Sequence, residues 1–272
     1  MFRASEDYHR ERRESGMDTR CVVKTDGVTK TFGDFIAVDK VDFEVNEKEA
    51  VGIIGPNGAG KTTFLNLLSG RYVPEEGRVF FKGRDVTRVP PQKRIEMGMM
   101  RTFQLVHVFD NISVYDNLAL SYYRKQQRSS FPLNCFLTKL IRNDIGKEVN
   151  TVLELFELED RSHQVVSNLP LGSKKRMELA MAHIADPEVI LLDEPFAGLG
   201  DTEIEEILTI LKNYIHKKTI IIVEHKITKL TKIVDTLAVM CDGAIIASGD
   251  CEETLNDPEV RKSYWKVEDE QV

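Results

Sequence analysis

The segment from residue 55 to residue 63 has the residue types and the spacing of a site that binds phosphate groups. It contains a glycine, four free positions and then Gly-Lys-Thr, which is the pattern of a phosphate-binding loop. Glycines let backbone N–H groups turn inward around a phosphate. Lys61 supplies a positive charge for the β- and γ-phosphates, and Thr62 supplies a hydroxyl for Mg²⁺. The candidate nucleotide-binding residues of this loop are Gly55, Pro56, Asn57, Gly58, Ala59, Gly60, Lys61, Thr62 and Thr63.

The loop stands between two predicted elements that suit it. The apolar residues 50–54 predict a short buried strand before the loop, and residues 63–68 predict a buried helix after it. A strand–loop–helix unit places phosphate groups at a helix N-terminus, where the helix dipole favours negative charge. The sequence therefore predicts a nucleoside triphosphate site.

Two further predicted strands end in residues that could act on a triphosphate. Residues 188–193 form an apolar run that ends in Asp193, and residues 219–224 form a second run that is followed by His225. Ligands of parallel sheets bind at the carboxyl ends of the strands. Asp193 is a candidate Mg²⁺ ligand beside Thr62, and Glu194 is a candidate general base that orients water. Considered without the phosphate loop, the same acid pair would equally suit a solvated turn.

The composition of the whole chain is that of an ordinary globular protein. Its 272 residues include 42% hydrophobic and 30% charged residues, and the formal net charge is −7. A dedicated nucleic-acid binder would normally show a basic excess, so no nucleic-acid partner is expected. The four cysteines stand far apart, which favours reduced thiols in a cytosol over a zinc site. Because no apolar run approaches the roughly 20 residues of a membrane span and no signal peptide is visible, we expect a cytoplasmic chain.

The order of predicted elements indicates an α/β fold. Residues 1–20 are charge-dense and predict a disordered tail, with Met17 as an alternative start. Residues 21–54 predict strands, including the alternating residues 41–45, and residues 78–82 predict another strand before Pro90 and Pro91 break the chain. Residues 186–249 alternate strands with helices, which predicts a parallel sheet.

Helical signals cover two other regions. Residues 113–168 predict a helical insertion, in which residues 149, 152, 153 and 156 form one apolar face. Thr202 and Glu205 have the spacing of a capping box for a later helix, whose apolar stripe contains residues 204, 207, 208 and 211.

Several motifs together resemble the ATP-binding subunits of ABC transporters over residues 21–267. Besides the phosphate loop they are the glutamine loop Arg101–Gln104, the acidic motif Ile190–Pro195, the D-loop Ala197–Asp201 and the histidine motif Val223–His225. The resemblance implies a P-loop ATPase fold, with a mainly parallel core sheet, an antiparallel β-subdomain and a helical subdomain at about residues 113–168. It leaves residues 268–272 as a C-terminal tail.

The resemblance narrows to the importers of branched-chain, hydrophobic amino acids. The features that carry it are Arg-Thr-Phe-Gln, the Leu-Pro-x-Gly form of the signature, Asp-Glu-Pro-x-Ala-Gly-Leu and the ending that begins at Asp257. Urea importer and lipopolysaccharide-export ATPases are similar. The resemblance therefore implies an ATPase that powers uptake of such amino acids or of a similar small polar solute. A regulatory or lipopolysaccharide-export type of ABC ATPase is the alternative.

The resemblance also implies how the site works. ATP would stack its adenine on Phe32, Gln104 would contact Mg²⁺ or the water, and His225 would hydrogen-bond the γ-phosphate. A second ABC ATPase subunit, identical or different, would supply its signature segment to this ATP. Permease subunits would hold the pair at the inner face of the cell membrane, and a solute-binding protein would act indirectly. The signature residues assigned to nucleotide binding are Leu169, Leu171, Gly172 and Ser173.

Five positions depart from the common pattern of the family, and two of them, Pro170 and Leu171, are common in the subgroup. The signature has Ser173 in place of glutamine, and we expect this serine to cap a helix over residues 174–184. Gly200 replaces the usual D-loop aspartate, and Lys226 replaces the aspartate that commonly follows the histidine. We expect these departures to affect turnover more than ATP binding, and they suggest a partner ATPase chain with a different sequence.

Overall fold

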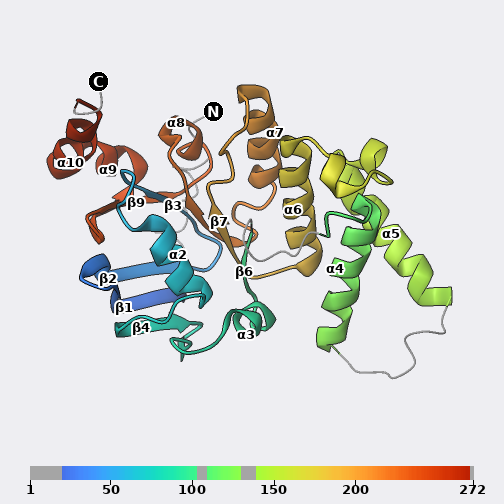
Figure 1. Ribbon diagram of the computed structural model, residues 1–272, viewed down its shortest axis with the longest axis horizontal. Coiled ribbons are helices and arrows are strands. Elements are labelled where there is room, and N and C mark those ends of the chain that lie inside the picture. The colour runs from blue at the N-terminus through green and yellow to red at the C-terminus, as the bar shows by residue number, and fades with distance from the viewer. Residues whose placement is uncertain (1–19, 103–108, 130–138, 270–272) are drawn as a thin grey trace, which may run out of the picture. The chain divides into compact units, whose positions relative to one another are not determined.

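The computed structural model describes residues 20–102, 109–129 and 139–269, so the predicted tail lies outside it apart from Arg20. The chain forms two compact units (Figure 1). The first unit combines the chain up to Val89 with the chain from Ile215 onward, and the second unit is the continuous segment Pro90–Tyr214. No described helix is both long and apolar enough to cross a membrane.

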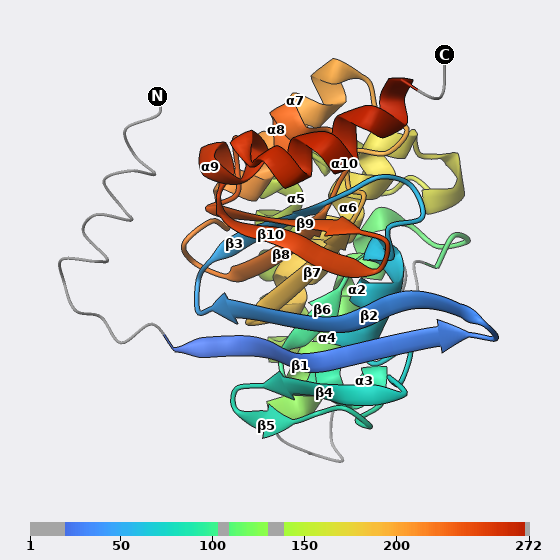
Figure 2. The ribbon, with the colours of Figure 1, turned by 90° about the vertical axis from the view of Figure 1, so that its left-hand side faces the viewer.

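One sheet of the first unit is antiparallel, as the alternating sequence pattern predicts. Its strands run in the order β2-β1-β4-β5 and are seen in blue and teal in Figure 2. In β2 the side chains of Val41, Phe43 and Val45 are buried and their neighbours are not, which confirms the half-buried strand. The bounds are β1 Cys21–Phe32, β2 Phe35–Asn46, β4 Glu76–Phe81 and β5 Arg84–Asp85.

The other sheet of the first unit is mainly parallel. Strand β3 pairs in parallel with β8 on one side and with β9 on the other, and β10 pairs antiparallel with β9. All residues of β3 and β8 are buried, which explains their continuous apolar sequences. The predicted parallel sheet is confirmed for these strands. Their bounds are β3 Ala50–Ile54, β8 Thr219–Val223, β9 Thr236–Cys241 and β10 Ala244–Asp250.

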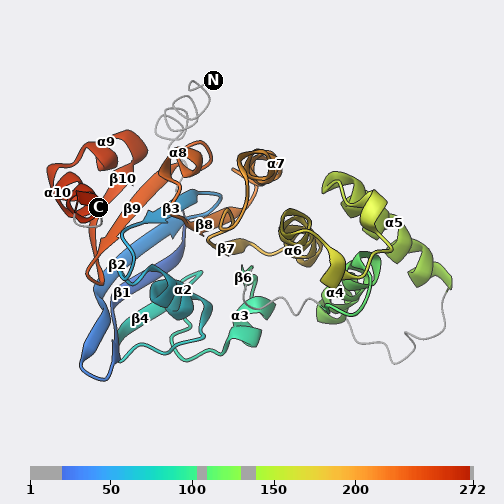
Figure 3. The same cartoon turned by 45° about the horizontal axis from the view of Figure 1, so that its top comes forward.

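The helices of the first unit pack against these sheets. Helix α2 begins at Lys61, within the phosphate-loop segment, and its Phe64 ring meets the ring of Phe43 edge-on, with centroids 5.4 Å apart. Helices α9 and α10 lie beside β10 (Figure 3), and the expected domain end at residue 267 falls inside α10. The bounds are α2 Lys61–Ser69, α8 Ile227–Leu230, α9 Cys251–Asn256 and α10 Pro258–Asp269.

The second unit contains two paired strands and a group of helices. Strands β6 and β7 are parallel, with Arg101 opposite Leu191. Pro90 and Pro91 begin the short helix α3, because proline fits the first helical position. Helices α4 and α5 lie within residues 113–168, where the sequence predicts helix, and the predicted apolar face is buried. The bounds are α3 Pro91–Glu96, β6 Met99–Arg101, α4 Val114–Ser129, α5 Lys139–Leu155, α6 Leu171–Ala185, β7 Val189–Asp193 and α7 Asp201–Lys212.

Two predicted helix caps are wrong. Helix α6 begins at Leu171 with Pro170 as its N-cap, so Ser173 lies inside the first turn and does not cap the helix. Pro170 has an extended ψ and precedes the helix without a capping side chain. Helix α6 therefore starts at Leu171, earlier than the expected residue 174. Helix α7 begins at Asp201, and its capping contact joins the Glu203 carboxylate to the Gly200 N–H at 3.0 Å instead of joining Thr202 and Glu205.

Candidate functional site

The phosphate loop turns around the side chain of its own lysine. Lys61 donates hydrogen bonds from Nζ to the carbonyl oxygens of Gly55, at 2.7 Å, and of Pro56, at 2.9 Å. Lys61 is buried, whereas Asn57, Gly58 and Thr62 are exposed. The ammonium group therefore lies under a loop whose outer edge and threonine hydroxyl are open to a ligand.

The walls of this loop come from two distant parts of the first unit. Gly60 has a φ of +96°, and a Cβ added there would lie 2.2 Å from the carbonyl oxygen of Ala37 in β2. On the other side the Gly243 N–H, in the turn between β9 and β10, donates to the carbonyl oxygen of Ala59 at 3.2 Å. The Asp39 N–H in turn donates to the carbonyl oxygen of Gly243 at 2.9 Å. The loop shape is thus fixed by both sheets of the unit.

His225 lies at the same sheet edge as the phosphate loop. The Glu224 N–H donates to the carbonyl oxygen of Ile53 at 3.2 Å, so the ends of β8 and β3 are neighbours. The buried carboxylate of Glu224 accepts a hydrogen bond from the His225 N–H at 3.0 Å, which holds the turn. The His225 side chain itself is exposed. The structure therefore brings together two of the predicted parts, the loop and the histidine, in the first unit.

Phe32, the residue predicted to stack on adenine, ends β1 and is 45% exposed. The ring of Tyr72 meets it edge-on with centroids 5.4 Å apart, and the Lys30 ammonium lies 5.4 Å from its centroid. Lys30 is held by Glu75, with Nζ and Oε1 2.6 Å apart. A ring that is nearly half exposed can stack on a base. Phe32 is therefore not a buried core aromatic.

In the second unit, Asp193 ends β7 and forms an ion pair with Arg101. The guanidinium Nη2 lies 2.6 Å from Oδ2 of Asp193, and the two side chains are 0% and 8% exposed. The other oxygen, Oδ1, is buried and makes no hydrogen bond within the described residues. Such an oxygen suits a hard divalent cation or a water molecule bound to one. Arg101 belongs to the glutamine loop motif, and the sequence of that motif does not predict its contact with Asp193.

Glu194 follows Asp193 in a left-handed backbone conformation, with a φ of 49°. This region is uncommon for residues with a side chain and is concentrated at functional sites. Lys175 of α6 holds the turn, because its Nζ donates to the carbonyl oxygens of Glu194, at 3.0 Å, and of Pro195, at 2.9 Å. Sequence reasoning missed Lys175, because its burial and its contacts with this turn appear only in the structure.

The signature segment forms the start of α6 and packs against the start of α7. Leu171 is 46% exposed, whereas Leu169, Gly172 and Ser173 are buried. A Cβ at Gly172 would lie 2.4 Å from the Glu203 carboxylate, and one at Gly198 would lie 2.8 Å from the Leu171 side chain. The second unit therefore brings the signature segment and the D-loop together. Gln104 lies outside the described residues.

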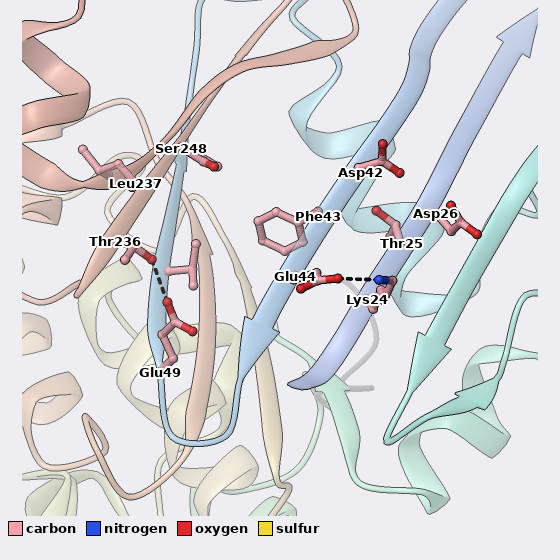
Figure 4. A pocket seen from close by; sticks show the side chains of 13 residues that line it. Lys24, Thr25, Asp26, Asp42, Phe43, Glu44, Glu49, Thr236, Leu237 and Ser248 are labelled. Carbon is pink, nitrogen blue, oxygen red and sulfur yellow. Dashed lines mark hydrogen bonds and ion pairs between the residues drawn. The ribbon is translucent and has the colours of Figure 1, made fainter. Parts of the chain in front are cut away.

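A separate cavity of about 560 Å³ lies in the first unit, between the antiparallel sheet and strands β3, β9 and β10 (Figure 4). Its lining includes Asp26, Asp42, Glu44 and Glu49, of which Glu49 accepts a hydrogen bond from Thr236 and Glu44 pairs with Lys24. Acidic walls repel a triphosphate, and no residue predicted to bind nucleotide lines this cavity. The cavity is therefore distinct from the predicted nucleotide site.

Comparison with known proteins agrees with this geometry. Residues 38–197 match the ABC transporter family. The chain belongs to the ABC transporter family of ATP-binding proteins. This match includes the phosphate loop, the signature segment and the acidic motif of the ABC ATPase.

Curated relatives of this ABC ATPase cover nearly the whole chain. It is 34% identical to the high-affinity branched-chain amino acid transport ATP-binding protein LivG of Salmonella typhimurium, over 89% of this chain and 97% of that protein. It is 31% identical to the corresponding protein BraF of Pseudomonas aeruginosa, over 90% and 98%.

Solved structures share the fold of this ABC ATPase. The ADP conformation of an ATP-binding cassette from an ABC transporter has 31% identity and a TM-score of 0.76, and covers 91% of this chain and 99% of that one. A nucleotide-free cassette has 31% identity and a TM-score of 0.74, with 88% and 97% covered. The predicted fold class is confirmed.

Proposed function

We propose that this chain is the ATP-binding and ATP-hydrolysing subunit of an ABC importer for branched-chain or other hydrophobic amino acids. The observation that best supports the ATPase activity is the phosphate loop, which turns around Lys61 between β3 and α2. The import of amino acids is supported by the similarity to LivG and BraF. Permease subunits and a solute-binding protein, which select the substrate, belong to this proposal.

The first unit binds the nucleotide. The N–H groups of the loop and the α2 N-terminus bind the phosphates, and Lys61 exchanges its carbonyl partners for phosphate oxygens. The exposed face of Phe32 stacks on the adenine. His225 donates a hydrogen bond to the γ-phosphate from the edge that it shares with the loop.

Thr62 and Asp193 would hold the Mg²⁺ of Mg-ATP, and the residues fit this role. Both offer oxygen atoms, which are the ligands that Mg²⁺ prefers, and Oδ1 of Asp193 makes no hydrogen bond within the described residues. When bound there, the ion would neutralise phosphate charge. Glu194 orients the attacking water and accepts its proton, while Gln104 contacts the same water or the ion.

A second ABC ATPase subunit completes the site. Its residues equivalent to Leu169, Leu171, Gly172 and Ser173 face the phosphates of this subunit, and this subunit offers its own to the partner. The pair lies at the cytoplasmic face of the membrane through the permease. Because Gly200 and Lys226 replace residues common in the family, the partner of this chain is an ATPase of different sequence, with two unequal sites.

Hydrolysis of Mg-ATP by the chain purified together with its partner ATPase subunit tests the proposal. We expect Glu194→Gln to lower the rate by about two orders of magnitude or more, since a general base contributes that much, and to leave ATP binding intact. Glu154→Gln, an exposed change on α5, is the control and should leave the rate unchanged. Hydrolysis in Glu194→Gln within tenfold of the native rate would contradict the role of Glu194. Absence of ATP binding in the native chain would contradict the proposal itself.

A further inference from the structure

Arg101 is a buried charge in direct contact with the acidic motif. Its side chain is 0% exposed at the end of β6, and its Nη2 lies 2.6 Å from Oδ2 of Asp193. A guanidinium taken out of water loses its hydration and needs compensation by a carboxylate. Arg101 and Asp193 therefore restrain each other.

The two strands set the geometry of this pair. Arg101 lies opposite Leu191 in the parallel pairing of β6 with β7, and the Thr102 N–H donates to the carbonyl oxygen of Leu191 at 2.9 Å. Asp193 ends β7 two residues beyond Leu191. Because a guanidinium is planar and its donors have fixed directions, its contact with one carboxylate oxygen restrains the orientation of the whole carboxylate.

The pairing leaves the two oxygens of Asp193 with different surroundings. Oδ2 accepts from Arg101, whereas Oδ1 is buried and has no hydrogen-bond partner among the described residues. Leaving a buried, ionised oxygen without a donor is unfavourable, and buried polar atoms of this kind usually mark an ion, a water molecule or a catalytic role. An ion pair that served stability alone would gain from engaging both oxygens.

We propose that Arg101 is a positioning residue for the metal ion of this ATPase, because it restrains Asp193 so that Oδ1 is presented to Mg²⁺ or to a water molecule bound to it. This inference rests on the proposed function, in which Asp193 holds the ion. Arg101 itself touches neither the ion nor the nucleotide. Its guanidinium acts by fixing the orientation of the Asp193 carboxylate. A positive charge without the planar guanidinium would not fix that orientation in the same way.

The test is the Mg²⁺ dependence of nucleotide binding, measured with a fluorescent ATP analogue and no turnover. We expect Arg101→Met to raise the half-saturating Mg²⁺ concentration at least tenfold, and to change the affinity measured in a metal chelator less than twofold. Arg101→Lys keeps the charge without the planar fork, so we expect a rise of about threefold. Arg176→Met removes an arginine that pairs with Glu157 in the same unit, and should leave the Mg²⁺ dependence unchanged.

A double-variant cycle separates positioning from general destabilisation. Asp193→Asn should raise the Mg²⁺ requirement as Arg101→Met does, and adding Arg101→Met to Asp193→Asn should raise it no further. This double variant removes both charges of the pair, so the comparison is available even where Arg101→Met fails to fold. A folded Arg101→Met with a Mg²⁺ requirement within twofold of native, or a further rise in the double variant, would overturn the inference.

The same data distinguish the inference from the proposed function. If Asp193→Asn raises the Mg²⁺ requirement and Arg101→Met does not, the role of Arg101 is overturned and that of Asp193 is kept. A native chain whose nucleotide affinity does not respond to Mg²⁺ overturns the assignment of Asp193 as well.

Discussion

At the scale of single residues, the phosphate loop depends on close approach of backbone to backbone. Gly60 and Gly58 both have positive φ values, +96° and +84°, but their surroundings differ. A Cβ at Gly60 would collide with the carbonyl oxygen of Ala37, whereas a Cβ at Gly58 would meet nothing within 4 Å. Only the first position couples the loop to the neighbouring sheet.

The two glycines therefore give a matched prediction. We expect Gly60→Ala to weaken ATP binding at least 100-fold, because the loop must move away from β2. Gly58→Ala adds only the strain of a left-handed conformation, about 1 kcal/mol, and should weaken binding roughly fivefold. Calorimetric titration with ATP checks both, after thermal unfolding has confirmed that each variant is folded. Equal losses in the two variants would contradict the role given to the Ala37 contact.

Single residues also show what the sequence could not predict. The phosphate loop, Asp193 and Glu194 stand in local patterns, so their types and spacing were sufficient to single them out. Arg101 and Lys175 act through contacts with residues far along the chain, at Asp193 and at the Glu194–Pro195 turn. No local pattern encodes such a contact, because it exists only once the strands and helices have packed.

At the scale of elements, helix α6 carries a carboxyl group whose surroundings disfavour its charged form. Glu178 is largely buried, and its Oε2 has no hydrogen-bond partner among the described residues. Burial raises the pKa of Glu178 from 4.5 to about 7, and the charge of Lys175 opposes this in part. The folded chain thus holds this proton more tightly than the unfolded chain does.

The raised pKa of Glu178 predicts that the stability of the folded chain depends on pH. Because the folded pKa is the higher one, the free energy of unfolding falls as pH rises from about 4.5 to about 7. Glu178→Gln removes the effect, so the variant should gain roughly 2 kcal/mol over the native chain on going from pH 5 to pH 8. Urea unfolding at both pH values measures the gain. An equal difference at both values, or the same gain in the exposed control Glu154→Gln, would contradict the assignment.

Elements were predicted well where periodicity decides them and poorly at their ends. The apolar faces that contain Phe156 and Ile204 are buried as expected, since burial follows directly from helical spacing. The sequence predicts Ser173 and Thr202 as the N-caps of α6 and α7, because their side chains can cap a helix. The observed N-caps are Pro170 and Gly200, which have no capping side chain.

At the scale of the whole molecule, the proposed pairing with a second ATPase predicts a change of size. We expect Glu194→Gln with Mg-ATP to double in mass only when a second ABC ATPase of different sequence is present, because unequal sites need an unlike partner. Light scattering with and without Mg-ATP measures this. A stable dimer of Glu194→Gln alone, with ATP at two equivalent sites, would contradict the unlike partner and leave the ATPase proposal standing.

The first unit is assembled from the two ends of the described chain, and this has a consequence for biosynthesis. Strand β3 pairs with β8 and β9, and the phosphate loop is held by the Gly243 N–H. At about 5–20 residues per second, a ribosome needs roughly ten to forty seconds to reach Gly243 after Ala59. The continuous second unit emerges within that interval. A nascent chain therefore acquires its nucleotide site late, and a product that stops before residue 243 cannot be rescued by ATP.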